Sequence, residues 1–173
     1  MPSGTVYAVT QDKTGFMYFA TNDGLVRYDG ERMKLFHHLP EDSFSLPKNS
    51  IKALLTDKDG KIWCAHDKLG VSCFDPLTGK FRLIDFKKYA TGNNFGDYIN
   101  NLYQNTDGKI YVCTFFSGKG IFIIDPQSGK AEQFLLTNYD PNHILSTANN
   151  NIIDLHFYND SLWLRNTKRC GIL

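Results

Sequence analysis

Aspartate-rich turns are the first residues in this chain whose types suit a chemical task, because carboxylates bind calcium. Asp57-Lys58-Asp59-Gly60 has the spacing with which an EF-hand calcium loop begins. Such a loop needs a bidentate glutamate at its twelfth position, and that position is Lys68. Related turns recur at Asp12-Lys13-Thr14-Gly15 and at Asp107-Gly108. We therefore interpret all three as turns of β-hairpins and expect no metal site there.

The histidines and cysteines do not show the spacing of a metal centre either. The five histidines include no HExxH pair, and the four cysteines include no CxxC pair. Cys64, Cys73 and Cys113 lie in strand-like stretches, where a free thiol behaves as a small hydrophobic group. We expect structural thiols, with a disulfide as the open alternative. The sequence predicts no metal and no other cofactor.

A second group of residues combines aromatic and cationic side chains in short polar segments. Aromatic faces beside lysine or arginine suit stacking on sugar rings and contact with acidic sugars. Phe115-Phe116 stands out, because it breaks a strand-like alternation and enters a polar segment. The alternative is that all of these are ordinary loop residues. The candidate ligand-binding residues are His66, Lys68, Phe115, Phe116, Lys119 and Arg169.

These segments belong to a sequence repeat. The order of residues that begins at Val6 returns from Ile51, Ile99 and Ile152. A period of roughly 40–50 residues made of short strands predicts a β-propeller, in which four-stranded sheets, called blades, surround a channel. One aromatic marker of the repeat recurs as Tyr18, Trp63, Tyr111 and Trp163.

Each copy contains four strand-like stretches separated by turns rich in Gly, Asp and Pro. The first copy predicts strands near 6–11, 16–20, 25–29 and 33–37. The same series follows from residues 51, 99 and 152. No stretch has the sustained 3.6-residue apolar period of a helix, so we expect negligible helix content. The predicted fold is all-β, a partial β-propeller of about three and a half four-stranded antiparallel blades in an open ring.

We place three blades at about 5–38, 50–87 and 98–136, and a half blade at about 151–173. The aromatic marker occupies one position in every copy, which predicts packing between adjacent blades instead of a sugar-binding row. In propellers the loops between strands two and three, with the loops between blades, line one mouth of the channel. Function concentrates in such loops. The candidate residues fall in the mouth loops at 22–23, 66–68, 115–119 and 166–169.

The two ends of the chain fall inside the repeat. Met1 to Val6 has the register of Leu46 to Ile51, and the last three residues only enter a third strand. Three and a half blades do not close a ring of 4–8 blades, so we interpret the chain as a fragment. Leu162-Trp163-Leu164-Arg165 would then be an unprotected strand edge, and such edges pair with other chains. We expect the isolated chain to self-associate unless the remaining blades of a longer parent chain are restored.

Composition and charge narrow the range of partners. A net charge of +1 gives no electrostatic basis for binding nucleic acid or an anionic membrane. The sequence has no apolar run of the length that spans a bilayer, and its first residues do not have the pattern of a signal peptide. We therefore expect neither nucleic-acid binding nor membrane contact by this segment.

The repeat resembles the two-component regulator propeller repeat. The pattern is I-x-x-[IL]-x-x-D-x-x-G-x-[IL]-W, then G-[LV] and an aromatic-Asp pair, with Ser-Leu-Pro-x-Asn before the first strand. Copies one and three match in register, although copy three has Tyr111 for tryptophan, and copy four has Asn159-Asp160-Ser161 at the glycine turn. Copy two carries the pattern as Ser45-Leu46-Pro47-Lys48-Asn49, Asp57, Gly60, Ile62-Trp63, Gly70-Val71 and Phe74-Asp75.

The resemblance implies the periplasmic sensor half of a hybrid two-component histidine kinase. Such repeats usually form two seven-bladed propellers, and many of them sense oligosaccharides. A β-sandwich, a membrane span, a kinase, a receiver and a DNA-binding domain follow in these proteins, and no kinase motif is found in this chain. We therefore expect a non-catalytic sensor fragment whose parent is periplasmic and binds an oligosaccharide.

Two other classes of function stay open. A propeller-type carbohydrate-active enzyme would need paired carboxylates that converge in the channel. Asp12, Asp57 and Asp107 recur at turn positions instead, which favours a structural role. A protein-interaction scaffold is the third class, since open repeat surfaces serve that role in other proteins.

Overall fold

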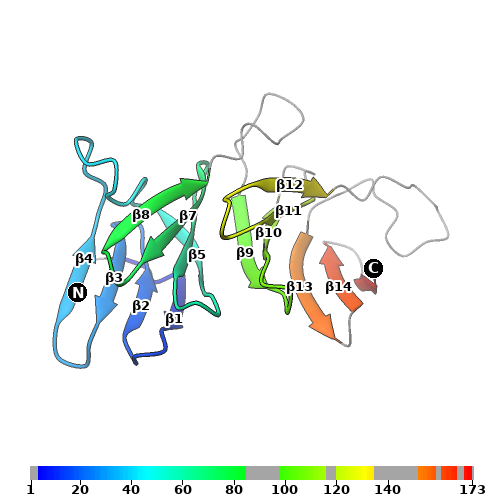
Figure 1. The fold of residues 1–173 in the computed structure, drawn as a ribbon, viewed down its shortest axis with the longest axis horizontal. Coiled ribbons are helices and arrows are strands. Elements are labelled where there is room, and N and C mark those ends of the chain that lie inside the picture. Colours follow the sequence, from blue (N-terminus) through cyan, green and yellow to red (C-terminus); the bar gives the residue numbers. More distant parts are fainter. Residues whose placement is uncertain are drawn as a thin grey trace. The chain divides into compact units, whose positions relative to one another are not determined.

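The structure is a computed structural model that describes residues 4–84, 98–115, 120–134, 152–158, 161–166 and 170–172. The chain divides into two compact units, Met1–Asp85 and Phe86–Leu173, and each is described by itself. Unit 1 contains two sheets, which we call blade 1 and blade 2 (Figure 1). Blade 1 consists of β1 (Ala8–Gln11), β2 (Met17–Ala20), β3 (Leu25–Tyr28) and β4 (Met33–Phe36). Blade 2 consists of β5 (Ile51–Thr56), β6 (Ile62–His66), β7 (Gly70–Asp75) and β8 (Lys80–Ile84).

Unit 2 contains two further sheets, blade 3 and blade 4. In all four sheets each strand pairs antiparallel with the next strand in sequence, and the described residues include no helix. The predicted all-β architecture of antiparallel blades is therefore confirmed. Blade 3 consists of β9 (Tyr98–Gln104), β10 (Ile110–Phe115), β11 (Ile121–Ile124) and β12 (Ala131–Phe134). Blade 4 consists of β13 (Ile152–Tyr158), β14 (Ser161–Asn166) and β15 (Cys170–Ile172).

One prediction about blade 4 is wrong. We expected Leu162–Arg165 to be a bare strand edge, but β14 pairs on both sides, with β13 and with β15. Trp163 lies opposite His156 on one side and opposite Ile172 on the other. The short strand at 170–172 pairs with Trp163, Leu164 and Arg165, so this part of the predicted edge is covered.

The Asp57 turn shows why these hairpins form. Asp57 Oδ1 accepts the backbone N–H groups of Asp59 and Lys61, both at 2.9 Å. Its Oδ2 accepts the indole N–H of Trp63 at 2.7 Å. One carboxylate thus caps the turn and fixes the aromatic marker of the next strand, so the hairpin interpretation is confirmed. Asp12 does the same in blade 1, where Tyr18 donates its hydroxyl to Oδ2 at 3.0 Å.

In blade 3 the equivalent of Asp57 is Asn105, and not Asp107 as the sequence suggested. The backbone N–H of Asn105 bonds to Lys109 O at 3.1 Å, just as that of Asp57 bonds to Lys61 O at 2.9 Å. Asp107 matches Asp59, the exposed residue two positions later. The Asp107-Gly108 dipeptide resembles the end of the Asp57 turn and not its first residue. The structural role belongs to the residue that starts the turn.

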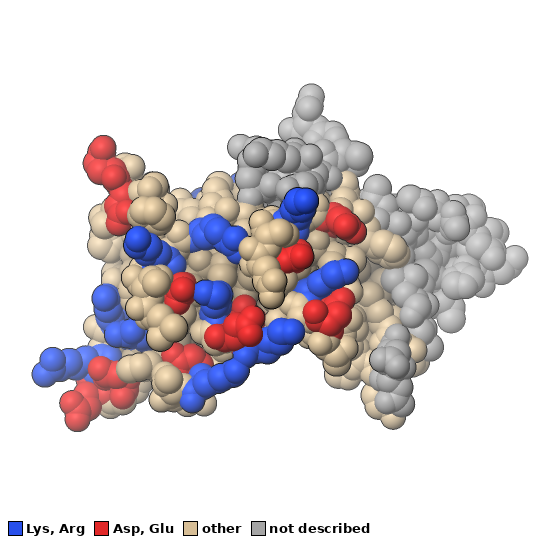
Figure 2. All heavy atoms as spheres, viewed as in Figure 1, with Lys and Arg blue, Asp and Glu red and all other residues tan. Residues whose placement is uncertain are grey.

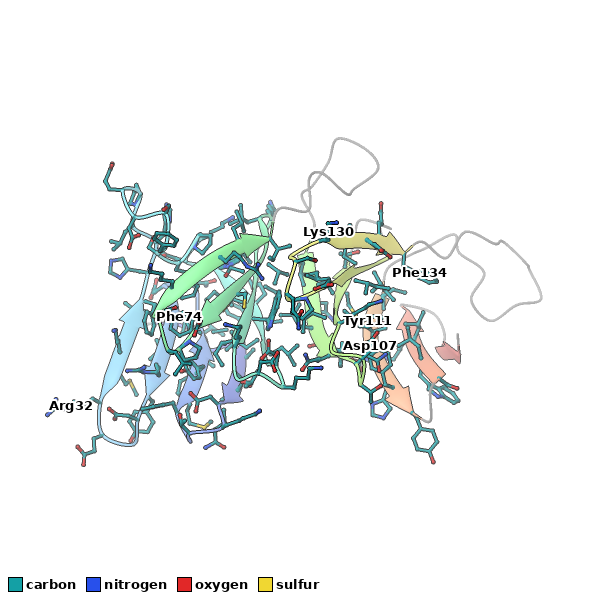
Figure 3. All side chains as sticks on the ribbon, in the orientation of Figure 1. Arg32, Phe74, Asp107, Tyr111, Lys130 and Phe134 are labelled. Atoms are coloured by element: carbon teal, nitrogen blue, oxygen red, sulfur yellow. The ribbon has the colours of Figure 1, made fainter. Side chains whose placement is uncertain are left out.

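Each blade buries side chains on both faces, because successive residues of a strand point to opposite sides. We call the face with the aromatic marker the trailing face and the opposite face the leading face. In unit 1 the ring of Tyr18, on the trailing face of blade 1, packs edge-on against Phe74 on the leading face of blade 2, with centroids 6.3 Å apart. Phe74 is labelled in Figure 3 and has no exposed surface. Burying such a side chain stabilises the fold by roughly 2–3 kcal/mol.

Unit 2 repeats this arrangement between blades 3 and 4. Tyr111, also labelled in Figure 3, packs edge-on against Phe157 with ring centroids 4.9 Å apart. Packing of the aromatic marker between adjacent blades is thus confirmed at Tyr18 and Tyr111. Hydrogen bonds also join the first strands of each pair of blades. In unit 1 the hydroxyls of Thr10 and Thr56 lie 2.7 Å apart, and in unit 2 the Tyr103 hydroxyl donates to Asp154.

Candidate functional site

Four polar or aromatic residues meet at one end of unit 1. In an antiparallel blade the start of the first strand and the end of the second share one end of the sheet. Tyr7 precedes β1 and Asn22 follows β2, while Ser50 precedes β5 and Lys52 is its second residue. Backbone hydrogen bonds hold these segments together, from Tyr7 N to Ala20 O at 2.9 Å and from Ile51 N to Thr21 O at 3.0 Å. We call Tyr7, Asn22, Ser50 and Lys52 the mouth cluster.

The Asn22 amide organises the mouth cluster. Its Nδ2 donates to the Tyr7 hydroxyl at 2.9 Å. Its Oδ1 accepts the Lys52 ammonium at 3.0 Å and the Ser50 hydroxyl at 3.2 Å. The Lys52 Nζ also lies 3.6 Å from the centre of the Tyr7 ring. The loop after β2, the segment before β5 and the start of β5 therefore fix the orientation of one tyrosine.

The electrostatics of the cluster agree with this geometry. Hydrogen bonds from Lys52 and then Asn22 lower the pKa of Tyr7, because both stabilise the phenolate oxygen. Tyr7 as a whole residue is nevertheless 41% exposed. The cluster thus presents a fixed aromatic ring beside an amide, a hydroxyl and an ammonium group. This combination suits stacking on a sugar ring with hydrogen bonds around it.

Asp67 and Lys48 border the mouth cluster. The Asp67 N–H donates to Ser50 O at 3.2 Å, and the Lys48 ammonium donates to Asp67 O at 2.5 Å. Among the described residues, Asp67 Oδ1 is buried without a hydrogen-bond partner. Backbone groups of Asp67 therefore hold the loop after β6 against the segment that leads into β5.

His66, the first candidate residue from the sequence, ends β6 as expected but has no exposed surface. Its Nε2 lies 2.7 Å from the Ser72 hydroxyl on the neighbouring strand. Burial lowers the pKa of His66 from 6.5 to about 4, so the ring is neutral at pH 7. The structure gives His66 a packing position instead of the surface position that we expected for a ligand contact. In blades 1 and 3 the equivalent residues are Thr21 and Thr114, whose hydroxyls bond to the carbonyls of Gly24 and Gly120.

The remaining candidate residues are placed only in part. Lys68 is exposed in the loop after His66 and has a positive φ of 56°. Phe115 is the last residue of β10, and its side chain lies outside the described part of the structure. Phe116, Lys119 and Arg169 also lie outside the described residues. The structure therefore brings only His66 and Lys68 to the end of unit 1 that carries the mouth cluster.

Sequence reasoning missed Tyr7, Ser50 and Lys52, although Asn22 lay in a predicted mouth loop. A signal was present, because Tyr7 and Lys52 occupy the same position of successive repeats. Val9 pairs with Phe19 in blade 1, and Leu54 pairs with Cys64 at the equivalent place in blade 2. Tyr7 comes two residues before Val9, and Lys52 comes two residues before Leu54. This position starts the first strand of a blade next to the mouth loops.

The other end of unit 1 offers a weaker site. A pocket of about 280 Å³ lies among the hairpin turns there, but several of its charged groups are engaged within the protein. Lys61 pairs with Asp75 at 3.0 Å, and the Arg27 guanidinium lies 4.7 Å above the Phe16 ring. These contacts occupy three of the charged groups that line the pocket.

The charge distribution fits the near-zero net charge. Figure 2 shows lysines and arginines interspersed with aspartates and glutamates on the face in view. Within the described residues, no three His, Cys, Asp or Glu side chains gather as a metal site would require. No helix in that part of the chain is long and apolar enough to cross a membrane.

Comparison with known proteins finds a family match in the second copy of the repeat. Residues 45–68 match the family described as two component regulator propeller. A search of curated protein sequences finds no match. The matched segment covers the end of the connection between β4 and β5, then β5, the Asp57 turn, β6 and the loop residues up to Lys68.

Solved structures share the fold over the whole chain. The extracellular domain of a putative hybrid two component system from B. thetaiotaomicron is 22% identical with a TM-score of 0.75, over 100% of this chain and 24% of that one. A second such domain from the same organism is 19% identical with a TM-score of 0.73, over 99% of this chain and 21% of that one. The PorZ component of the type-IX secretion system of Porphyromonas gingivalis is 14% identical with a TM-score of 0.53, over 95% and 31%.

The chain spans about a quarter of the length of the two extracellular domains. At these identities the likeness shows the fold, which is that of propeller blades. The family match at residues 45–68 confirms the resemblance on which the sequence interpretation rested. Residues 45–68 therefore match the two-component regulator propeller repeat, and the chain shares its fold with the extracellular domains of putative hybrid two-component systems.

Proposed function

We propose that the chain is a non-catalytic ligand-binding part of a hybrid two-component sensor, periplasmic in its parent protein, and that its ligand is an oligosaccharide. The observation that carries this proposal is the mouth cluster. Asn22 and Lys52 hold the Tyr7 ring in place from the neighbouring loop and blade, while the ring stays open to solvent. A preorganised aromatic ring loses little entropy when a sugar stacks on it.

The family match and the structural likeness support the sensor context. The carboxylates that an enzyme would need are used elsewhere. Asp12 and Asp57 accept hydrogen bonds from their own hairpin turns and from Tyr18 and Trp63. A glycosidase-like pair of carboxylates is therefore not formed by these residues. The remaining blades of a longer chain would complete the binding surface.

The test is titration of the chain with a panel of neutral and acidic oligosaccharides by calorimetry. Binding of at least one member should weaken by roughly tenfold in Tyr7→Ala, the change in affinity expected for loss of one stacked ring. Leu77→Ala is the matched control, because Leu77 is an exposed apolar residue in the turn at the other end of blade 2. Equal affinity of the wild type and Tyr7→Ala for every bound sugar would refute the assignment of this site.

A further inference from the structure

Blades 1 and 2 leave a cavity of about 280 Å³ among their hairpin turns. Tyr18 of blade 1 and Phe74 of blade 2 are fully buried and meet edge-on. Two residues nearer the turns, the same positions hold Phe16 and Pro76, and both line the cavity. Both blades are complete four-stranded sheets, so the cavity belongs to an interface inside unit 1. Its volume is near the lower limit for small-molecule sites, which suits a ligand of about one ring.

Arg27 is the group in this cavity that best suits an anion. It lies opposite Tyr18 in the pairing of β2 with β3, so its side chain is on the face of blade 1 that meets blade 2. Its guanidinium lies 4.7 Å above the centre of the Phe16 ring. The ring covers one face of the guanidinium, whereas the N–H donors lie in the guanidinium plane. A guanidinium stacked in this way can bind a carboxylate through two parallel hydrogen bonds.

Two carboxylates that line the cavity are already engaged within the protein. Asp12 accepts hydrogen bonds from its own turn and from the Tyr18 hydroxyl. Asp75 forms an ion pair with Lys61 at 3.0 Å. Within the part of the chain that the structure describes, no ion pair joins Arg27 to a carboxylate. The charge of Arg27 is therefore the one that a bound anion would compensate.

Three exposed residues border the cavity, and they are Lys13, Asp59 and Leu77. The Lys13 ammonium donates to the carbonyl of Lys58, which holds this second cation beside the turn of blade 2. Leu77 is 96% exposed and follows Pro76, so the two form an apolar border. The cavity thus combines a cationic group with an apolar wall, as a site for an amphiphilic anion requires.

We propose that this cavity is a second ligand site, separate from the mouth cluster, and that it binds a small organic acid. The carboxylate of the ligand lies on Arg27, and its apolar body lies against Pro76 and Leu77. The site is at the opposite end of unit 1 from the mouth cluster, so the proposal does not rest on oligosaccharide binding there.

The experiment titrates the full chain by calorimetry with phenylacetate and with phenylacetamide, an uncharged compound of nearly the same shape. Phenylacetate should bind at least about tenfold more tightly, because only the carboxylate forms a charge-assisted pair. Arg27→Met should abolish this preference, since it removes the donors and keeps an apolar side chain. Arg32→Met is the matched control and should keep the preference, because Arg32 is an exposed arginine between β3 and β4 of the same blade (Figure 3).

Three further variants test the site without removing Arg27. Leu77→Ala should weaken phenylacetate binding by roughly threefold through lost apolar contact, whereas Tyr7→Ala in the mouth cluster should leave it unchanged. Asp59→Asn removes an exposed negative charge, so it should strengthen phenylacetate binding and leave phenylacetamide binding unchanged. Circular dichroism checks that each variant is folded.

Three results would overturn the proposal. The first is no saturable binding of phenylacetate at concentrations up to about 10 mM. The second is equal affinity of the wild type for phenylacetate and phenylacetamide. The third is a preference for phenylacetate that survives in folded Arg27→Met. If Arg27→Met does not fold, unchanged phenylacetate binding in both Leu77→Ala and Asp59→Asn overturns the proposal instead.

Discussion

Acid should destabilise unit 1 through His66. The ring is fully buried and neutral, and burial lowers its pKa from 6.5 to about 4. Above pH 6.5 both the folded and the unfolded chain hold the ring neutral. As the pH falls below 6.5, His66 is protonated in the unfolded chain but stays neutral in the folded chain. The free energy of unfolding therefore decreases until the pH reaches about 4.

The size of this effect follows from the two pKa values. Each pH unit between them costs the folded state roughly 1.4 kcal/mol, which gives about 3 kcal/mol over the whole interval. His66→Gln removes the titration and keeps a polar side chain next to Ser72. The variant should therefore lose about 3 kcal/mol less stability than the wild type between pH 7 and pH 4. Carboxylates that titrate in both proteins contribute equally to the two pH profiles, so their contribution cancels when the free energies of unfolding are compared.

Urea unfolding at a series of pH values measures this difference. Trp63 reports on blade 2, and a Trp163→Phe background removes the second indole from the fluorescence signal. His37→Gln is the control, since His37 is an exposed histidine in unit 1. It should follow the wild-type pH profile. Parallel profiles for the wild type and His66→Gln would refute the claim that a buried neutral histidine couples folding to pH.

Three further outcomes test the packing. Asp57→Ala should cost about 3–5 kcal/mol by urea unfolding, because it strands a buried indole N–H and two turn amides; a cost below about 1 kcal/mol would contradict this role. Gly24→Ala should cost more than Gly30→Ala: both glycines have positive φ, but only at Gly24 would a Cβ lie 2.2 Å from a backbone oxygen, that of Phe36. Equal costs would show that the contact is relieved by a backbone shift. The described thiols are Cys64, Cys73 and Cys113, and burial raises the pKa of each, that of Cys73 to about 12. These thiols should therefore react with a disulfide reagent only after unfolding. Rapid labelling in native buffer would contradict this expectation.

Much of the fold could be predicted because its signals are local. A hairpin is specified by a few residues, as the Asp57 turn shows, and strand alternation repeats every two residues. The same locality explains one error. Asp107 has the right neighbour in Gly108, but the backbone hydrogen bonds assign the turn to Asn105. A second error arose at β14, where a further strand of three residues covers Trp163, Leu164 and Arg165 of the predicted edge.

The candidate site was harder to predict because it depends on contacts between blades. The sequence places His66 at the end of a strand, but only the packing of that strand shows that the ring is buried. The sequence contains Tyr7, Asn22 and Lys52 far apart, and only the stacking of blade 1 on blade 2 brings them together. Strand pattern and turn chemistry are properties of neighbours in sequence, so the chain by itself determined the blades. Burial and side-chain clustering depend on which face meets which, so only the tertiary structure decided the site.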